Sequence, residues 1–147
     1  APDIREERFE EICQNFRAAL EKELIRLCDQ RTPDLILTTG GTGFSSRDIT
    51  PEATLAVAER PAPGIAEAIR AASMEITRRA MLSRAVSVIR GKTLIVNLPG
   101  SPKACMESMD VFMDQLPHGL SLLRGSVMDC GRRQEAPDAG RGRSGRI

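Results

Sequence analysis

Two glycine-rich stretches contain the residues of this sequence that are best suited to bind an anion. In LTTGGTGFSSRDITPEAT (37–54), Gly40, Gly41 and Gly43 follow an apolar run, and in NLPGSPK (97–103) a further glycine does the same. Glycines let bare backbone N–H groups approach an anion, and the positive ends of the helix dipoles expected just after both stretches favour negative charge. Both stretches therefore indicate phosphate as the ligand.

Asp48 adds a carboxylate to the first stretch, and a carboxylate beside a phosphate is repulsive unless a cation lies between them. Mg²⁺ meets this need, because proteins hold it with one or two carboxylates and the oxygens of bound phosphates. Lys103 and Arg47 are then placed to neutralise charge on a transferring phosphoryl group. The alternative is that Asp48 caps the turn at Thr50 and pairs with Arg47 on the surface. The first stretch matches neither the Walker A nor the Rossmann pattern.

The elements around the first stretch follow from apolar periodicity and from the prolines. Apolar residues at helical spacing over 9–28 predict one long amphipathic helix that ends near Arg31, before a Thr-Pro pair. Residues 35–39 are nearly all apolar, which is typical of a strand covered on both faces. Thr50 is the expected N-cap of a helix that starts with a proline and runs to about Arg60.

The second half continues the α/β pattern. We expect a helix after the Pro-Gly at 63–64, then two strands joined by a tight turn at Gly91, and a helix capped by Ser101. A shorter helix should end before Gly125. This order predicts one α/β domain over residues 1–125, a three-layer fold with a mostly parallel central sheet and helices on both faces. Ligands of such folds bind at the carboxyl edge of the sheet, where the two glycine stretches should converge.

Composition excludes several classes of protein. The 147 residues include 21 basic and 20 acidic ones, a net charge of +1, so no chain-wide field favours nucleic acid or a membrane surface. No apolar run approaches the roughly 18 residues that span a bilayer, and no signal peptide is evident, which favours a cytoplasmic protein. Residues 126–147, rich in arginine and glycine, are expected to form a flexible tail. The four cysteines lie far apart in the sequence, which argues against a zinc site and against a disulfide framework. We expect all four to be reduced: Cys13, Cys28, Cys105 and Cys130.

Four segments in a fixed order carry a resemblance to a known family. They are TTGGTGFSSRDITPEAT, PAPGIAEAIRAAS, MLSRAVSVIRGKTLIVNLPGSPKA and LPHGLSLLRG, between about Asp34 and Gly125. Together they resemble the molybdopterin adenylyltransferase family of molybdenum cofactor biosynthesis, whose relatives include the G domain of gephyrin. The resemblance implies a homotrimeric α/β protein that joins the terminal phosphate of molybdopterin to the AMP portion of Mg·ATP and releases pyrophosphate.

The resemblance also implies roles for single residues. Asp48 would be a catalytic carboxylate that helps hold Mg²⁺, and Ser83 would lie toward the pterin. A cap at the start of the next strand is the alternative role for Ser83. The residues expected to cradle phosphates and nucleotide are Gly40, Gly41, Thr42, Gly43, Pro99, Gly100, Ser101, Pro102 and Lys103.

Two features depart from the family pattern. Family members open with a β-α-β segment that has no counterpart before Ala1, so we expect the chain to be incomplete at its amino terminus. Pro2-Asp3 resembles a Pro-Asp pair of the family, but its distance from the glycine stretch is longer than expected. Asp3 is therefore either a second catalytic and metal-binding carboxylate or only the N-cap of the first helix.

These departures keep two other functions open. The first is a trimeric module of the same fold that binds pterin or serves as a scaffold without catalysis. The second is a nucleotide pyrophosphate hydrolase of the competence-damage type.

Overall fold

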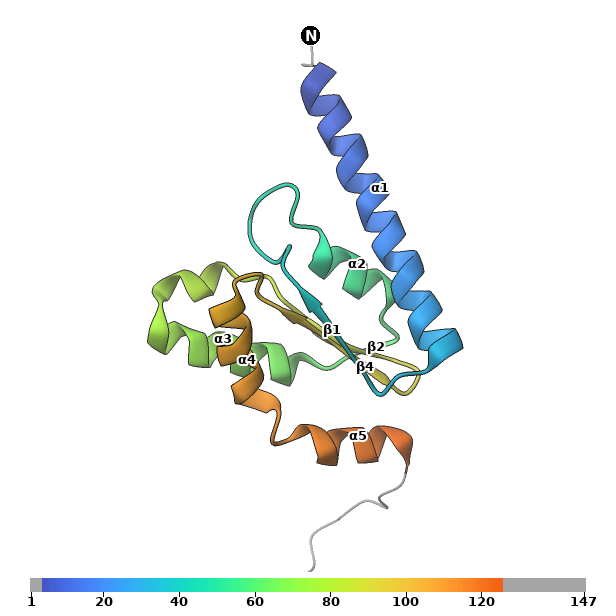
Figure 1. Ribbon diagram of the computed structural model, residues 1–147, viewed down its shortest axis with the longest axis vertical. Helices are drawn as coiled ribbons and strands as arrows, with labels where there is room; N and C mark the ends of the chain where they lie inside the picture. Colours follow the sequence, from blue (N-terminus) through green and yellow to red (C-terminus); the bar gives the residue numbers. More distant parts are fainter. Residues whose placement is uncertain (1–3, 126–147) are drawn as a thin grey trace, which may run out of the picture.

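The computed structural model describes residues 4–125, which form a central sheet with helices on both faces (Figure 1). In chain order, the elements are α1 (Ile4–Arg26), the π-helical turn η1 (Leu27–Arg31), β1 (Leu35–Thr39), α2 (Thr50–Val57), β2 (Arg60–Pro61), α3 (Pro63–Ile76), the 3-10 helix η2 (Arg78–Leu82), β3 (Ser87–Arg90), β4 (Thr93–Leu98), α4 (Pro102–Phe112) and α5 (Leu116–Arg124). No helix in this range is long and apolar enough to cross a membrane. Asp3, Cys130 and the predicted tail at 126–147 lie outside the described residues.

The sheet has the strand order β1-β4-β3-β2. β1 and β4 run parallel, whereas β4 with β3 and β3 with β2 run antiparallel. The described sheet is therefore mixed, and the expectation of a mostly parallel sheet is wrong for residues 4–125. The tight turn at Gly91, which was predicted, reverses the chain between β3 and β4. β2 was not predicted, because a strand of two residues is too short to show a period in the sequence.

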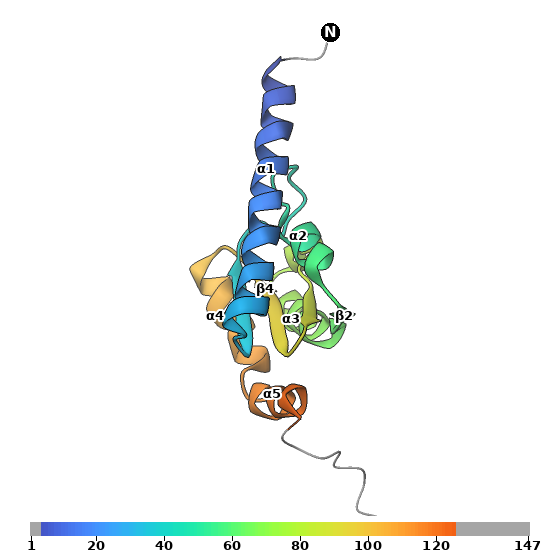
Figure 2. The same ribbon diagram turned by 90° about the vertical axis from the view of Figure 1, so that its right-hand side faces the viewer.

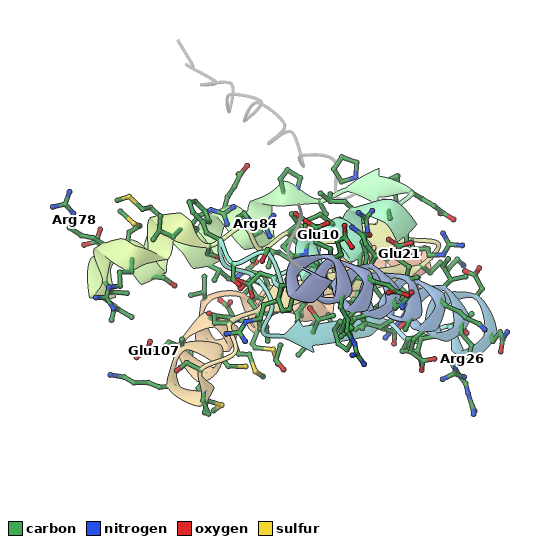
Figure 3. All side chains as sticks on the ribbon, turned by 90° about the horizontal axis from the view of Figure 1, so that it is seen from above. Glu10, Glu21, Arg26, Arg78, Arg84 and Glu107 are labelled. Carbon is green, nitrogen blue, oxygen red and sulfur yellow. The ribbon has the colours of Figure 1, made fainter. Side chains whose placement is uncertain are left out.

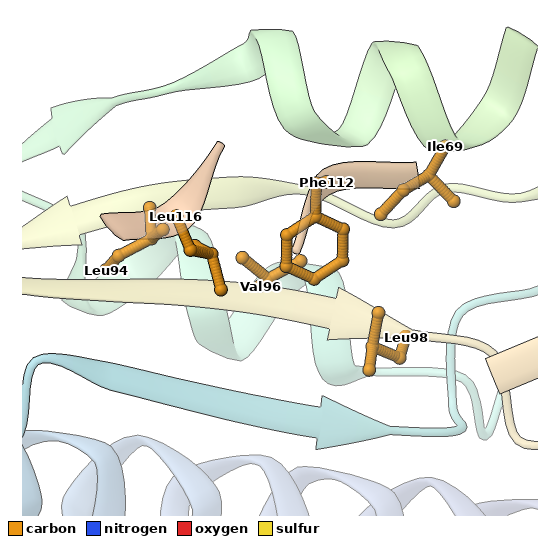
Figure 4. Close-up of a cluster of buried hydrophobic side chains, with 6 residues drawn as sticks. All are labelled: Ile69, Leu94, Val96, Leu98, Phe112 and Leu116. Atoms are coloured by element: carbon orange, nitrogen blue, oxygen red, sulfur yellow. The ribbon is translucent and has the colours of Figure 1, made fainter. Parts of the chain in front are cut away.

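Two apolar clusters lie between the sheet and its helices, and they confirm the predicted three-layer α/β fold. Side chains along β4 alternate between the two faces, so this strand is buried on both sides. The cluster under α3, α4 and α5 contains Ile69, Leu94, Val96, Leu98, Phe112 and Leu116 (Figure 4). The cluster under α1 and α2 contains Leu24, Cys28, Val57, Val88 and Ile95.

Several helix ends agree with the sequence. Helical structure stops at Thr32, which has a φ of 48° and precedes Pro33. Ser101 caps α4 as predicted, because its side chain accepts a hydrogen bond from the backbone N–H of Ala104. Gly125 closes α5 in the left-handed conformation, with a φ of 75°.

The start and the end of α2 differ from the prediction. Thr50 is the first residue of the helix, and Ile49 occupies the N-cap position without a capping side chain. The N–H of Thr50 instead donates to the carbonyl oxygen of Gly41, a contact with the glycine stretch that local sequence rules do not include. The helix ends at Val57 rather than near Arg60, because Arg60–Pro61 pairs with β3.

α1 runs along the sheet and extends past it (Figures 1 and 2). Near its carboxyl end Leu24 is 2% exposed. Closer to its amino terminus, Phe9, Ile12 and Phe16 are 40%, 58% and 64% exposed. The predicted apolar stripe is therefore covered over only part of its length within the described residues.

Candidate functional site

The two glycine stretches leave neighbouring parallel strands at the same edge of the sheet. The N–H of Gly40 donates to the carbonyl oxygen of Leu98 at 2.9 Å, directly after the paired strands β1 and β4. A Cβ added to Gly100 would lie 3.2 Å from the Cα of Gly40, so the two backbones meet where neither has a side chain. The predicted convergence of the two stretches is confirmed.

The first stretch forms a loop, residues 40–49, whose glycines have a structural purpose. Gly40 and Gly41 have φ values of 82° and 66°, in the left-handed region that favours glycine. A Cβ on Gly41 would lie 2.4 Å from the Oγ1 of Thr50. Within residues 4–125, the N–H groups of Gly41, Thr42 and Gly43 donate no hydrogen bond. Their hydrogen-bonding capacity is thus unused within this range, as an anion site made of backbone N–H groups requires.

Asp48 is part of this loop and closes a turn within it. Its Oδ2 accepts a hydrogen bond from the N–H of Ser45 at 3.0 Å, and its N–H donates to the carbonyl oxygen of Ser45 at 2.9 Å. A Cβ added to Gly43 would lie 2.9 Å from the same Oδ2. Asp48 thus forms a turn with Ser45, and it does not cap the turn at Thr50. In the described part of the chain it forms no ion pair with Arg47, and its Oδ1 accepts no hydrogen bond.

The donor set suits Mg²⁺ together with substrate oxygens. Residues 4–125 contain no group of three or more His, Cys, Asp or Glu side chains that could hold a metal ion. Mg²⁺ does not need such a cage, because it commonly takes one or two carboxylates, phosphate oxygens and water. The Oδ1 of Asp48 fits that requirement. Whether Asp3 is the second ligand stays a prediction.

Arg84, between η2 and β3, belongs to this site although the sequence did not single it out. Its N–H donates to the carbonyl oxygen of Thr42 at 2.8 Å, its Nε to that of Gly43 at 2.6 Å, and its Nη2 to that of Asp48 at 2.5 Å. Its Nη1 forms an ion pair with Glu52 in the first turn of α2. The side-chain partners stand 32 to 41 residues away in the sequence, so no local pattern marks this arginine.

The charge of Arg84 is balanced by Glu52. Burial raises the pKa of Glu52, but the hydrogen bond from Arg84, a backbone hydrogen bond and the charges of Arg84 and Arg17 outweigh it, and the pKa lies below its ordinary value of 4.5. Glu52 is therefore ionised at neutral pH. Seen from above, Arg84 lies among the central loops, whereas Arg78 and Glu107 lie at the periphery (Figure 3).

A cavity of about 220 Å³ lies beside the loops, between α3, η2 and the start of α4. Ser83 lines it together with Thr42 and Pro99 from the two glycine stretches. The Oγ of Ser83 also accepts a hydrogen bond from the N–H of Ala85 at 3.3 Å, so Ser83 is both a local cap and a lining residue. Arg70 holds this segment, because its Nη1 donates to the carbonyl oxygens of Ser83 and Ala85 at 3.0 and 3.2 Å.

Comparison with known proteins relates this chain to a family. Residues 6–118 match the family described as “Probable molybdopterin binding domain”. Over 122 residues the chain is 43% identical to the molybdopterin adenylyltransferase of Helicobacter pylori, and the match covers 83% of this chain and 69% of the relative. The chain belongs to the molybdopterin adenylyltransferase family.

Two further relatives agree with this membership. The chain is 49% identical over 89 residues to gephyrin of Dictyostelium discoideum, a match that covers 60% of this chain and 12% of gephyrin. The solved structure of the molybdopterin biosynthesis enzyme MoaB from Thermus thermophilus superposes with a TM-score of 0.69 at 48% identity, over 74% of this chain and 69% of MoaB. The resemblance stated from the sequence is confirmed, and so is the α/β fold.

Lys103 differs from the other residues expected at the family's site. It lies in the first turn of α4, as predicted, but its side chain is 83% exposed and its Nζ lies 3.9 Å from the Oε1 of Glu107. Among the described residues Lys103 thus forms its ion pair along its own helix and not with Asp48. Ala104, the next residue, lines the cavity, so the N-terminus of α4 does adjoin the site.

Proposed function

We infer that this chain transfers the adenylyl group of Mg·ATP to the terminal phosphate of molybdopterin and releases pyrophosphate. The observation that carries the inference is the meeting of the two glycine stretches at one edge of the sheet, with Asp48 in the first loop and the Ser83 cavity beside both stretches. The relatives at 41–43% identity that are named molybdopterin adenylyltransferase support the same reaction.

The reaction brings two anions together, so charge repulsion and alignment form most of the barrier. An oxygen of the terminal phosphate of molybdopterin attacks the α-phosphorus of ATP. The bond between the α-phosphorus and the bridging oxygen breaks, and pyrophosphate leaves with the electron pair. The attacking oxygen is already anionic at pH 7, so the site needs no strong general base. This agrees with a site made of backbone N–H groups and a carboxylate.

We assign the parts of the site as follows. The N–H groups of residues 41–43 bind phosphate oxygens of ATP, together with residues 99–103, and the cavity lined by Ser83 takes the pterin. Asp48, with Asp3 as a second carboxylate, would hold Mg²⁺. The ion would neutralise part of the negative charge of the phosphates. The family resemblance further leads us to propose a cytoplasmic homotrimer without nucleic-acid or membrane partners. Sedimentation of the purified protein can test whether it is a trimer.

The test is incubation of the protein with molybdopterin, Mg²⁺ and ATP, followed by detection of adenylylated molybdopterin and pyrophosphate. Pterin-dependent release of pyrophosphate supports the transferase. Retention of pterin without turnover would identify a non-catalytic binding module instead. Cleavage of nucleotide in the absence of pterin would identify a hydrolase.

Asp48→Asn tests the residue assignment within the same assay. The amide oxygen of the variant can still accept the hydrogen bond from Ser45, so the fold and the pterin affinity should persist. We expect adenylylation to fall by about 100-fold or more, a typical loss when one electrostatic contact to the transition state is removed. Asp110→Asn, on the exposed side of α4, is the matched control and should retain full activity. Unchanged activity of Asp48→Asn would show that Asp48 is a turn residue only.

A further inference from the structure

We propose that Arg84, held by Glu52, is a positioning residue that keeps Asp48 and the first glycine loop in a fixed place relative to Ser83. The role builds on the proposed function, because the loop must hold its place only if it binds the reacting phosphates. Arg84 is not assigned a contact with substrate.

The guanidinium of Arg84 has little capacity left for a phosphate. Its Nε donates to Gly43 and its Nη2 to Asp48, at 2.6 and 2.5 Å. Its Nη1 bonds one carboxylate oxygen of Glu52, and Nη2 lies 3.5 Å from the other. A guanidinium has five N–H donors, so four hydrogen bonds leave at most one free. Its charge is also paired, and the geometry therefore favours holding the loop over binding substrate.

The loop depends on these bonds. Among the described residues, the other hydrogen bonds of residues 41–48 join Ser45 to Asp48 within one turn and Gly41 to Thr50 where the loop closes. Its glycines give the backbone no strong preference for one conformation. Arg84 donates hydrogen bonds to the carbonyl oxygens of residues 42, 43 and 48, and so connects both sides of the loop to the rest of the fold.

The position of Arg84 in the chain gives the contact a second effect. Ser83, directly before it, lines the cavity and is held from the other side by Arg70. The segment at 83–85 is therefore anchored to α3 through Arg70 and to the glycine loop through Arg84. The proposed pterin and nucleotide halves of the site meet at this arginine. A misplacement of about 1 Å between reacting groups can lower a rate by about 100-fold.

The experiment compares Arg84→Lys with Arg90→Lys in the full chain. Arg90 is a matched control, because its Nε and Nη2 bond both carboxylate oxygens of Asp29 at 3.0 and 2.9 Å and its Nη1 bonds the carbonyl oxygen of Val57 at 3.0 Å. Lysine keeps each charge but cannot reproduce the planar fork. Two quantities are measured: amide hydrogen exchange of residues 44–50, and kcat and KM for adenylylation with varied Mg·ATP.

We expect exchange at residues 44–50 to be about fivefold faster or more in Arg84→Lys, because at least one tertiary hydrogen bond of the loop is lost. It should be unchanged in Arg90→Lys. We expect kcat to fall by about 10-fold to 100-fold in Arg84→Lys with a much smaller change in KM, as for a misaligned but still binding site. Arg90→Lys should keep both kinetic constants.

Two results would overturn the proposal. One is a rate of amide hydrogen exchange at residues 44–50 that is the same in Arg84→Lys as in Arg90→Lys. The other is a raised KM with an unchanged kcat, which would mean that Arg84 binds the phosphates directly. If Arg84→Lys does not fold, Glu52→Gln decides by the same two criteria, because it leaves the arginine in place and removes only the opposing charge. If the unaltered protein shows no adenylylation, the proposed function fails, and the exchange comparison still decides whether Arg84 holds the loop.

Discussion

The two glycine stretches meet at one edge of the sheet but are held there by different means. The second connection, residues 99–101, spans three residues between β4 and α4, with a proline on each side of the glycine and serine and a Ser101 side chain that caps the helix. The first, residues 40–49, spans ten residues between β1 and α2 and is held by Arg84 at residues 42, 43 and 48. A short loop is thus determined by its own residues, and the long one by a partner far along the chain.

This difference matters for the site. Asp48, the carboxylate proposed for catalysis, lies on the loop that depends on tertiary contacts. Its place is therefore set only when the segment around Arg84 has packed against the loop. The following predictions test the comparison, from the largest expected effect to the smallest.

Gly41→Ala should be the most damaging alanine substitution in either loop. The new Cβ would lie 2.4 Å from the Oγ1 of Thr50, at a φ of 66°, and we expect a loss of about 3 kcal/mol in the free energy of unfolding, measured with urea. Gly91→Ala measures the cost of the positive φ alone, because Gly91 has a φ of 57° and no atom lies within 4 Å of its added Cβ. Gly100→Ala measures the cost of a close contact alone, because its added Cβ would lie 3.2 Å from the Cα of Gly40 and Gly100 has no positive φ. Both should cost less. An equal loss at Gly41 and Gly91 would show that the Thr50 contact carries no cost.

Asn97→Ala should weaken the connection between the two strands that lead into the loops. Asn97 is fully buried, and its Nδ2 donates to the Oγ1 atoms of Thr38 and Thr54 at 2.8 and 2.9 Å. Its Oδ1 accepts from the N–H of Val86 at 3.2 Å. Leaving such groups without partners should cost about 2 kcal/mol in unfolding free energy. Ser108→Ala, a buried control with one helical hydrogen bond, should cost less, and the reverse order would contradict this account.

Ser101→Ala should cost about 1 kcal/mol in unfolding free energy, the usual value of an N-cap side chain. The Oγ of Ser101 accepts from the N–H of Ala104 at 3.5 Å, and the prolines nearby keep the loop in place without it. Ser46→Ala in the first loop is the matched control, because Ser46 is exposed and forms no hydrogen bond within the described residues. A loss at Ser46 as large as that at Ser101 would mean that local capping does not distinguish the loops.

Glu52→Gln should flatten the acid end of the stability profile. The pKa of Glu52 in the fold lies below 4.5, so the group contributes stability above that pH, and the contribution is lost as the pH falls through the folded value. The variant should therefore differ from the unaltered chain at neutral pH and converge with it below pH 4.5. The effect should be the smallest of the four, because the side chain is 38% exposed. A difference that grows on acidification would contradict the sign.

Much of the fold was predictable because its signals are local. β1, α3, the hairpin of β3 and β4, the Ser101 cap and the closing Gly125 each depend on residues within one or two turns of the chain. The strand β2 and the early end of α2 were not predictable, because Arg60–Pro61 becomes a strand only through its pairing with β3. The expectation of a mostly parallel sheet was wrong because β3 pairs antiparallel with both β4 and β2.

The sequence by itself indicated the two glycine stretches, Asp48 and Ser83 as parts of a candidate site, and it carried the family resemblance, because residue types and their order hold that information. It did not indicate Arg84. Only the tertiary structure decided that Gly40 and Gly100 touch, that Thr50 binds back to Gly41, and that Arg84 holds the loop of Asp48. The physical reason is distance along the chain. Propensity and capping act over about four residues, whereas the contacts of Arg84 depend on the packing of segments that lie 32 to 41 residues apart.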